Sequence, residues 1–281
     1  MKARAPLEPK ADPADGGVRP LFDVCLQPES ASTADLETMR FFGLSAAVVA
    51  AQAQPRATAA SLREHFDDLV QRQLPRLASA GVRGYAALGV HPQAVPRRGL
   101  SEVLSALPSY FGAGKVVALG AIGLHQGGEA EVEVEAFSEQ LQLARRLKVP
   151  VLVTTPRRDK ERVTKQVLRM LGESGLPPQR VLVDRASART VPLVLECGYW
   201  AALAVHPDEL SAEAAVAIIR RRGAQKLMVS SSAGAGAGDI LSLARLVSLL
   251  DKGRLSPQLI AKVAHENAAE FFRVPVPTWS P

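Results

Sequence analysis

Eight short apolar runs recur along the chain, and each is followed by a segment with helical periodicity. Glycine- or proline-marked turns separate the two kinds of segment. Such alternation is typical of parallel βαβ units, and a count of eight predicts a closed (β/α)8 TIM barrel in a single α/β domain. The predicted strands cover residues 21–26, 44–51, 85–90, 116–122, 150–154, 180–183, 199–205 and 226–230.

The chain length agrees with this prediction, because 281 residues fit one barrel of about 250 residues plus short tails. We assign the barrel domain to residues 20–273. Residues 1–19 combine proline, alanine, glycine and charge without a periodic apolar face, so they are predicted to be a disordered tail. Residues 274–281 are predicted to form an extended C-terminal tail. Two long helices are expected, over residues 58–80, either kinked or divided into two pieces at Pro75, and over residues 257–272.

Composition narrows the possible locations and partners. No run approaches the ~18 apolar residues of a membrane span, and the N-terminus lacks the apolar segment of a signal peptide, so a cytoplasmic protein without a membrane partner is expected. The net charge of +6 is scattered and aromatic residues make up 5%, a pattern that does not favour a nucleic-acid partner. Cys25 and Cys197 lack metal-site spacing and are expected to be buried, reduced thiols.

Six strings, in a fixed order, carry a family resemblance. They lie at residues 117–123, 140–144, 149–153, 155–160, 181–184 and 267–272. Their order resembles the TatD-related metal-dependent hydrolases, a branch of the amidohydrolase-like TIM barrels, over roughly residues 21–272. The resemblance implies a (β/α)8 fold whose functional site lies at the carboxyl ends of the strands.

The same resemblance implies one or two divalent metals, held by a His-x-His pair after the first strand and by further acidic and histidine ligands. In this chain the pair falls on Cys25 and Gln27. The other ligand positions fall on Ala121, Thr154, Arg185 and, on or near it, Gly234. Only Cys25 is a strong metal donor, and the cation of Arg185 repels a divalent ion at short range. We therefore predict a degenerate member without a catalytic residue or cofactor, a pseudoenzyme that acts as a binding or scaffold protein. The alternative is an active metal-dependent hydrolase of phosphoesters, esters or amides with an atypical site.

Other polar side chains are expected at the mouth of the barrel and could bind a ligand. They are Asp23, His91, His125, Arg157, Arg158, Asp184, Arg185 and His206. A first hypothesis is the binding of an unidentified protein partner, and a second is an anion pocket formed by the three arginines. In the second, Arg185 replaces the lost metal and forms an ion pair with Asp184 or Asp23. A third hypothesis is a zinc site built from Cys25, His91, His125 and His206. Alanine-rich outer helices, such as residues 212–217, leave a homo-oligomer open.

Overall fold

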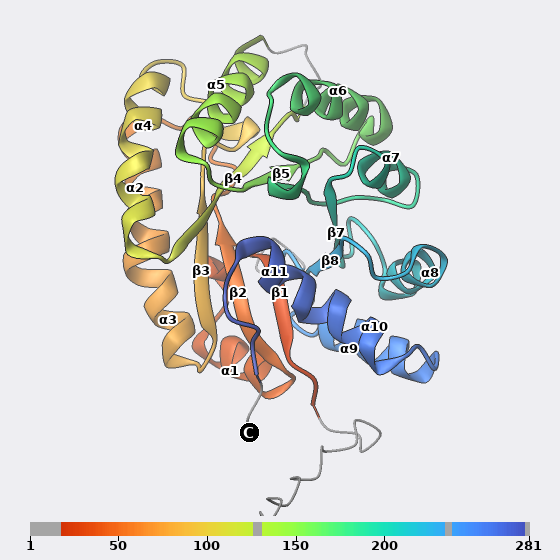
Figure 1. Cartoon of the computed structure of the whole chain (residues 1–281). Helices are drawn as coiled ribbons and strands as arrows, with labels where there is room; N and C mark the ends of the chain where they lie inside the picture. Colours follow the sequence, from red (N-terminus) through yellow and green to blue (C-terminus); the bar gives the residue numbers. More distant parts are fainter. Residues whose placement is uncertain (1–17, 126–130, 234–237, 279–281) are drawn as a thin grey trace, which may run out of the picture.

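The computed structural model describes residues 18–125, 131–233 and 238–278. Eight parallel strands follow one another in chain order around a single sheet, which confirms the predicted (β/α)8 barrel (Figure 1). The strands are β1 (Leu21–Leu26), β2 (Leu44–Ala50), β3 (Arg83–Leu88), β4 (Val116–Gly123), β5 (Val151–Thr154), β6 (Val181–Val183), β7 (Trp200–Ala204) and β8 (Leu227–Ser230).

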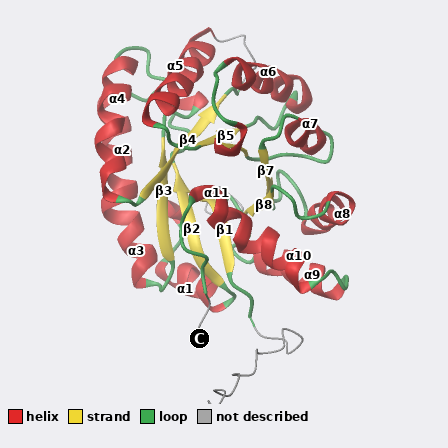
Figure 2. Ribbon diagram, viewed as in Figure 1, coloured by secondary structure: helices red, strands yellow, loops and turns green. Residues whose placement is uncertain are grey.

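Helices surround the strands on the outside of the barrel (Figure 2). Their apolar faces pack on the outward-facing strand residues, as the helical periodicity of the sequence requires. The helices are α1 (Thr33–Phe41), α2 (Ala59–Asp68), α3 (Leu74–Ser79), α4 (Leu100–Ala106), α5 (Glu131–Leu147), α6 (Lys160–Glu173), α7 (Thr190–Glu196), α8 (Ala212–Arg222), α9 (Ser242–Lys252), α10 (Pro257–Ala261) and α11 (Asn267–Phe272).

Both long predicted helices contain a π-helical turn. Between α2 and α3 this turn spans Leu69–Gln73 and ends just before Pro75, which occupies the first turn of α3. A wider turn accommodates a proline, since the proline ring clashes with the preceding turn and has no N–H to donate. The second π-helical turn, Lys262–Glu266, separates α10 from α11. Directly after it, the Asn267 side chain donates hydrogen bonds to the carbonyls of Ala224 (2.6 Å) and Leu227 (2.7 Å) and fixes α11 to β8.

The barrel interior is built from small residues on the strands and large aromatic residues at one end. Alternate strand residues point inward, and many of these are alanines, such as Ala46 and Ala202. The remaining space is filled by an aromatic floor, which we define as Phe22, Tyr85, Trp200, Phe271 and Phe272. Ring centroids of Phe22 and Phe272 lie 6.0 Å apart, and those of Phe271 and Trp200 lie 5.9 Å apart. Phe271 and Phe272 come from α11, which therefore supplies part of the core.

The first and last strands meet where the sheet closes. The backbone N–H of Ser232 donates to the carbonyl of Cys25 at 3.1 Å, and the N–H of Gln27 donates to the carbonyl of Ala233 at 3.0 Å. These bonds bring the residues that follow β8 against the end of β1.

Several predictions about the tails and the cysteines can be compared with the structure. Residues 1–17 and 279–281 lie outside the described residues, while Arg19, in the predicted tail, forms an ion pair with Asp251 of α9 at 2.9 Å. Cys25 is buried as expected, but Cys197 is exposed and the prediction for it is wrong, because Cys197 lies in the turn that leaves α7. Within the described ranges, no helix combines the length and the apolar character that crossing a membrane requires.

Candidate functional site

A cavity of about 620 Å³ opens at the carboxyl ends of the strands. Side chains that follow β1 to β6 line it, which is the position expected for a functional site in a TIM barrel. Seven of the predicted site residues meet there: Gln27, His91, His125, Thr154, Arg157, Arg158 and Arg185. The others do not line this cavity: Asp23, Cys25, Ala121 and Asp184 are buried in the barrel interior, and His206 is buried after β7. Gly234 lies outside the described residues.

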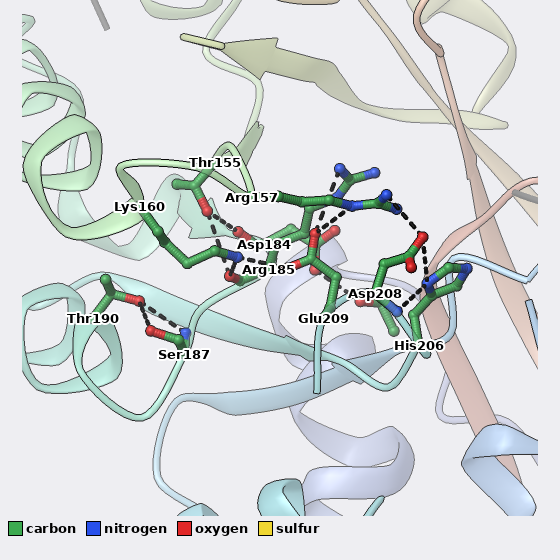
Figure 3. Close-up of polar contacts among 11 residues, drawn as sticks. Thr155, Arg157, Lys160, Asp184, Arg185, Ser187, Thr190, His206, Asp208 and Glu209 are labelled. Atoms are coloured by element: carbon green, nitrogen blue, oxygen red, sulfur yellow. Dashed lines mark hydrogen bonds and ion pairs between the residues drawn. The ribbon is translucent and has the colours of Figure 1, made fainter. Parts of the chain in front are cut away.

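Beside this cavity, a glutamate with a buried side chain forms ion pairs with three basic side chains. The Glu209 side chain, which is 4% exposed, pairs with Lys160 at 2.6 Å, with Arg157 at 3.2 Å and with Arg185 at 3.8 Å. Arg157 also pairs with Asp208 at 2.8 Å. Figure 3 shows these side chains converging from the segments after β5, β6 and β7. The cluster therefore ties three neighbouring loops together.

The backbone at Arg185 is fixed by two side chains from the segment after β5. Arg185 has a left-handed φ of 59°, and its carbonyl accepts a hydrogen bond from the Lys160 Nζ at 2.8 Å. The Thr155 Oγ1 donates to the carbonyl of Asp184 at 3.0 Å (Figure 3). Within the described part of the chain, the Arg185 Nε is buried without a hydrogen-bond partner.

The ion pair predicted from Arg185 to Asp184 or Asp23 is not the one that forms. Arg185 pairs with Glu209, while hydroxyl and backbone donors hold the two aspartates. The Ser230 Oγ donates to Asp184 at 2.7 Å, and Asp23 accepts from the hydroxyl of Ser231 and from two backbone N–H groups. These hydrogen bonds satisfy the carboxylates without a cation in direct contact.

Burial is the largest cause of the raised pKa values of Asp23 and Asp184. It raises the pKa of Asp23 from 3.8 to about 6, against the opposing effect of the hydrogen bonds from Ser231 and Cys25. Burial also raises the pKa of Asp184, and the nearby charge of Arg185 opposes this shift. The pKa of the Cys25 thiol is raised well above its usual value by burial and by the charge of Asp184, so Cys25 is a protonated, unreactive thiol at neutral pH.

The residues to which the family resemblance assigned metal ligands do not form a donor set suited to a divalent ion. A hydrolytic metal site needs three or more ligands drawn mainly from histidine, aspartate and glutamate. Here the positions hold a protonated thiol at Cys25, an amide at Gln27, a methyl group at Ala121, a hydroxyl at Thr154 and a cation at Arg185. Across residues 18–125, 131–233 and 238–278, no three His, Cys, Asp or Glu side chains are grouped so that they could hold a metal.

The histidines do not form the zinc site that we considered. His91 and His125 line the cavity, but Cys25 and His206 do not. The Nδ1 atoms of His91 and His206 accept hydrogen bonds from the backbone N–H groups of Gln93 (3.2 Å) and Asp208 (3.1 Å). Burial, followed by the charges of Arg185 and His125, lowers the pKa of His91 from 6.5 to about 3. His91 is therefore a neutral residue whose Nε2 carries the ring hydrogen.

Seven polar residues in and around the cavity were not predicted as site residues from the sequence. The missed residues lie in the segments that follow β5, β7 and β8, at the end of β8 or in the first turn of α6, so their closeness to strand ends was an available signal. They are Thr155, Lys160, Arg162, Asp208, Glu209, Ser230 and Ser231.

Comparisons with known proteins identify the family. The model of the TatD-related DNase family matches residues 70–233, more than half of the chain. An uncharacterized metal-dependent hydrolase of Methanocaldococcus jannaschii is 29% identical over 242 residues, which cover 85% of this chain and 94% of the relative. The structure of a TatD-like protein from Archaeoglobus fulgidus is similar with a TM-score of 0.75 and 27% identity, over 90% of this chain and 100% of that one. The phosphotriesterase homology protein of Escherichia coli, solved with phosphate in its active site, shares the fold with a TM-score of 0.69 and 15% identity, over 91% of this chain and 98% of that one. With its eight-stranded barrel and this match, the chain belongs to the TatD-related DNase family.

Proposed function

We propose that this TatD-family barrel binds a small anion at its mouth and has lost metal-dependent hydrolysis. The observation that carries the proposal is the arginine wall of the cavity, which we define as Arg157, Arg158, Arg162 and Arg185. Guanidinium groups bind carboxylates and phosphates through pairs of parallel, charge-assisted hydrogen bonds. A cavity with four of them on one side is suited to an oxyanion.

The charges around this wall are not balanced. The four arginines and Lys160 face three carboxylates, those of Asp159, Asp208 and Glu209, and a fourth, Asp184, lies near Arg185. Arg158 makes neither an ion pair nor a hydrogen bond with the residues that the structure describes. The net positive charge attracts an anion, and partial burial of Arg185, whose side chain is 18% exposed, strengthens that attraction by reducing screening.

The N-terminus of α6 adds to the positive electrostatic potential of the arginine wall. Its N-cap residue, Asp159, makes no capping hydrogen bond, since its carboxylate pairs with Arg162 at 3.2 Å instead. The first N–H groups of this 14-residue helix are therefore left without a side-chain acceptor beside the cavity. Such groups favour negative charge.

Binding of inorganic phosphate, measured by isothermal titration calorimetry at low salt, tests the proposal. We expect saturable binding that Arg185→Gln weakens at least about tenfold, because one charge-assisted hydrogen bond to an anion contributes about 1.5–3 kcal/mol. Arg83→Gln is the matched control, since Arg83 is exposed at the opposite end of the barrel, at the start of β3. Equal binding by wild type and Arg185→Gln, or no binding of phosphate, carboxylate or sulfate by the wild type, contradicts the proposal.

A metal-dependent hydrolase with an atypical site is the competing function, and the similarity to the Methanocaldococcus protein motivates it. The donor set described above argues against this function. Protein purified from manganese- and zinc-supplemented medium, then dialysed, is expected to contain less than stoichiometric metal by elemental analysis. Stoichiometric metal, together with phosphodiesterase or esterase turnover that a chelator abolishes, would establish the hydrolase instead.

A further inference from the structure

The mouth cavity is larger than an inorganic anion needs. Its volume of about 620 Å³ lies within the range of ~300–1,000 Å³ typical of pockets for small organic ligands. The arginine wall occupies only the part of the cavity that follows β5 and β6 and begins α6. The rest of the cavity must therefore contact another part of the ligand.

The opposite wall carries no aspartate, glutamate, lysine or arginine among the residues that the structure describes. We call it the amide wall and define it as Gln27, Gln52, Gln93, His91 and His125, which follow β1, β2, β3 and β4. Because β1 to β4 form the other half of the ring of strands, the charges of the cavity are segregated to one side. This arrangement suits a ligand with one charged end and one uncharged end.

The amide wall offers hydrogen-bonding groups that the protein itself does not use. The side-chain amides of Gln27 and Gln93 make no hydrogen bond with the described residues. Gln52 donates through Nε2 to Glu29 at 2.6 Å, which leaves its carbonyl oxygen as an acceptor. His91 uses Nδ1 to accept from the Gln93 backbone, so its Nε2–H remains as a neutral donor.

We infer that the ligand is a small organic anion with an oxyanion at one end and an uncharged, hydroxyl- or amide-bearing group at the other. The oxyanion, a phosphate or a carboxylate, binds the arginine wall, and the uncharged end hydrogen-bonds to the amide wall. This inference rests on the proposed function, since it extends the same anion site. It adds that Gln27 and Gln93 determine specificity, because they distinguish a hydroxylated ligand from an alkyl one.

A series of ligands with one oxyanion and different uncharged parts tests the inference by calorimetry. The probes are inorganic phosphate, butyl phosphate and ribose 5-phosphate, with butyrate and gluconate as the carboxylate arm. In the wild type we expect ribose 5-phosphate or gluconate to bind at least tenfold more tightly than the alkyl compound with the same oxyanion. If ribose 5-phosphate binds more tightly than gluconate, the natural oxyanion is a phosphate, and the reverse order indicates a carboxylate.

Substitutions distinguish the contributions of the arginine wall and the amide wall to ligand affinity. Gln27→Ala combined with Gln93→Ala is expected to remove the preference for the hydroxylated ligand and to leave phosphate affinity within twofold of wild type. Arg185→Gln is expected to weaken every ligand in the series. Gln142→Ala is a control for surface amide substitutions, since Gln142 is an exposed residue of α5 and does not line this cavity.

The outcomes distinguish this inference from the proposed function. If phosphate binds but hydroxylated and alkyl ligands bind equally, the inference is wrong and the anion site stands. The inference is also wrong, and the anion site again stands, if the double glutamine variant keeps the full preference. If none of the anions binds, the anion site itself is refuted.

Discussion

The two ends of this barrel are built by opposite means. At the floor, aromatic rings fill the space that the interior alanines leave, and Phe271 and Phe272 of α11 close it. At the mouth, charged groups gather around a buried glutamate and leave an open cavity of about 620 Å³. From this comparison we expect stability to depend mainly on the floor, whereas the mouth offers room and charge for the proposed ligand. Substitutions at the two ends should therefore have separable effects.

Removing a floor ring is expected to have the largest effect. Phe271 is 3% exposed and contacts Trp200 and Phe272, with centroid distances of 5.9 and 4.9 Å. Phe271→Ala should lower the free energy of unfolding by about 3–5 kcal/mol, since the lost ring leaves a cavity. Urea unfolding measures this effect. Phe41→Ala, at a ring that is 68% exposed, should stay within about 0.5 kcal/mol of wild type.

The same Phe271 variant also tests the separation of the two ends. Anion affinity should stay within twofold of wild type under conditions in which the variant remains folded. A loss comparable to that of Arg185→Gln would show that the floor controls the mouth.

His91 is the mouth residue whose effect on stability should be large, but only in acid. Its pKa is about 3 in the folded protein and 6.5 when unperturbed, so between these values the unfolded chain binds more protons and stability falls as the pH falls. From pH 7 to pH 4 this costs about 3 kcal/mol. His91→Asn retains an acceptor for the Gln93 N–H and does not titrate, so it should lose this contribution.

Unfolding measured at pH 7 and pH 4 for wild type and His91→Asn checks this prediction. The difference between the two proteins isolates His91, because the raised pKa of Asp23, about 6, acts in the opposite direction in both: it stabilises the fold as the pH falls towards 4. A difference that does not change with pH would show that His91 titrates normally.

Substitution of Asn267 tests how much a polar contact of α11 contributes to stability at the floor. The Asn267 side-chain amide donates hydrogen bonds to the carbonyls of both Ala224 and Leu227, and Asn267 is 5% exposed. Asn267→Ala leaves those carbonyls without this donor and should cost about 1–3 kcal/mol in urea unfolding, with anion binding unchanged. A smaller loss than that of an exposed control, the neighbouring Glu266→Ala, would mean that α11 is held by its aromatic rings alone.

Arg158 should give the smallest effect. It is exposed beside the cavity, so solvent screens its charge, and Arg158→Gln should weaken phosphate binding only about two- to threefold. Raising the salt concentration should reduce even this difference. A tenfold loss at physiological salt would move the main binding contact from Arg185 to Arg158.

The identities of the strands could be read from the sequence because each is a local pattern. The β1 bounds, Leu21–Leu26, were predicted without error, and the other strands differ by one or two residues at their ends. The cavity residues that follow strand ends, such as Arg157 and Arg185, were predicted for the same reason. The long helix around Pro75 was predicted to be kinked or divided, but the π-helical turn that accommodates the proline was not predicted.

The pairing of these side chains was decided only by the tertiary structure. Asp23 binds Ser231 across 208 positions of sequence, and Glu209 binds Lys160 across 49. Nothing local to these residues indicates a partner, because the contacts exist only once the barrel closes and the loops after β5, β6 and β7 converge. The sequence thus determined the strands and the order in which they lie. Which carboxylate would hold Arg185, and which wall of the cavity would lack arginines and carboxylates, depended on long-range packing.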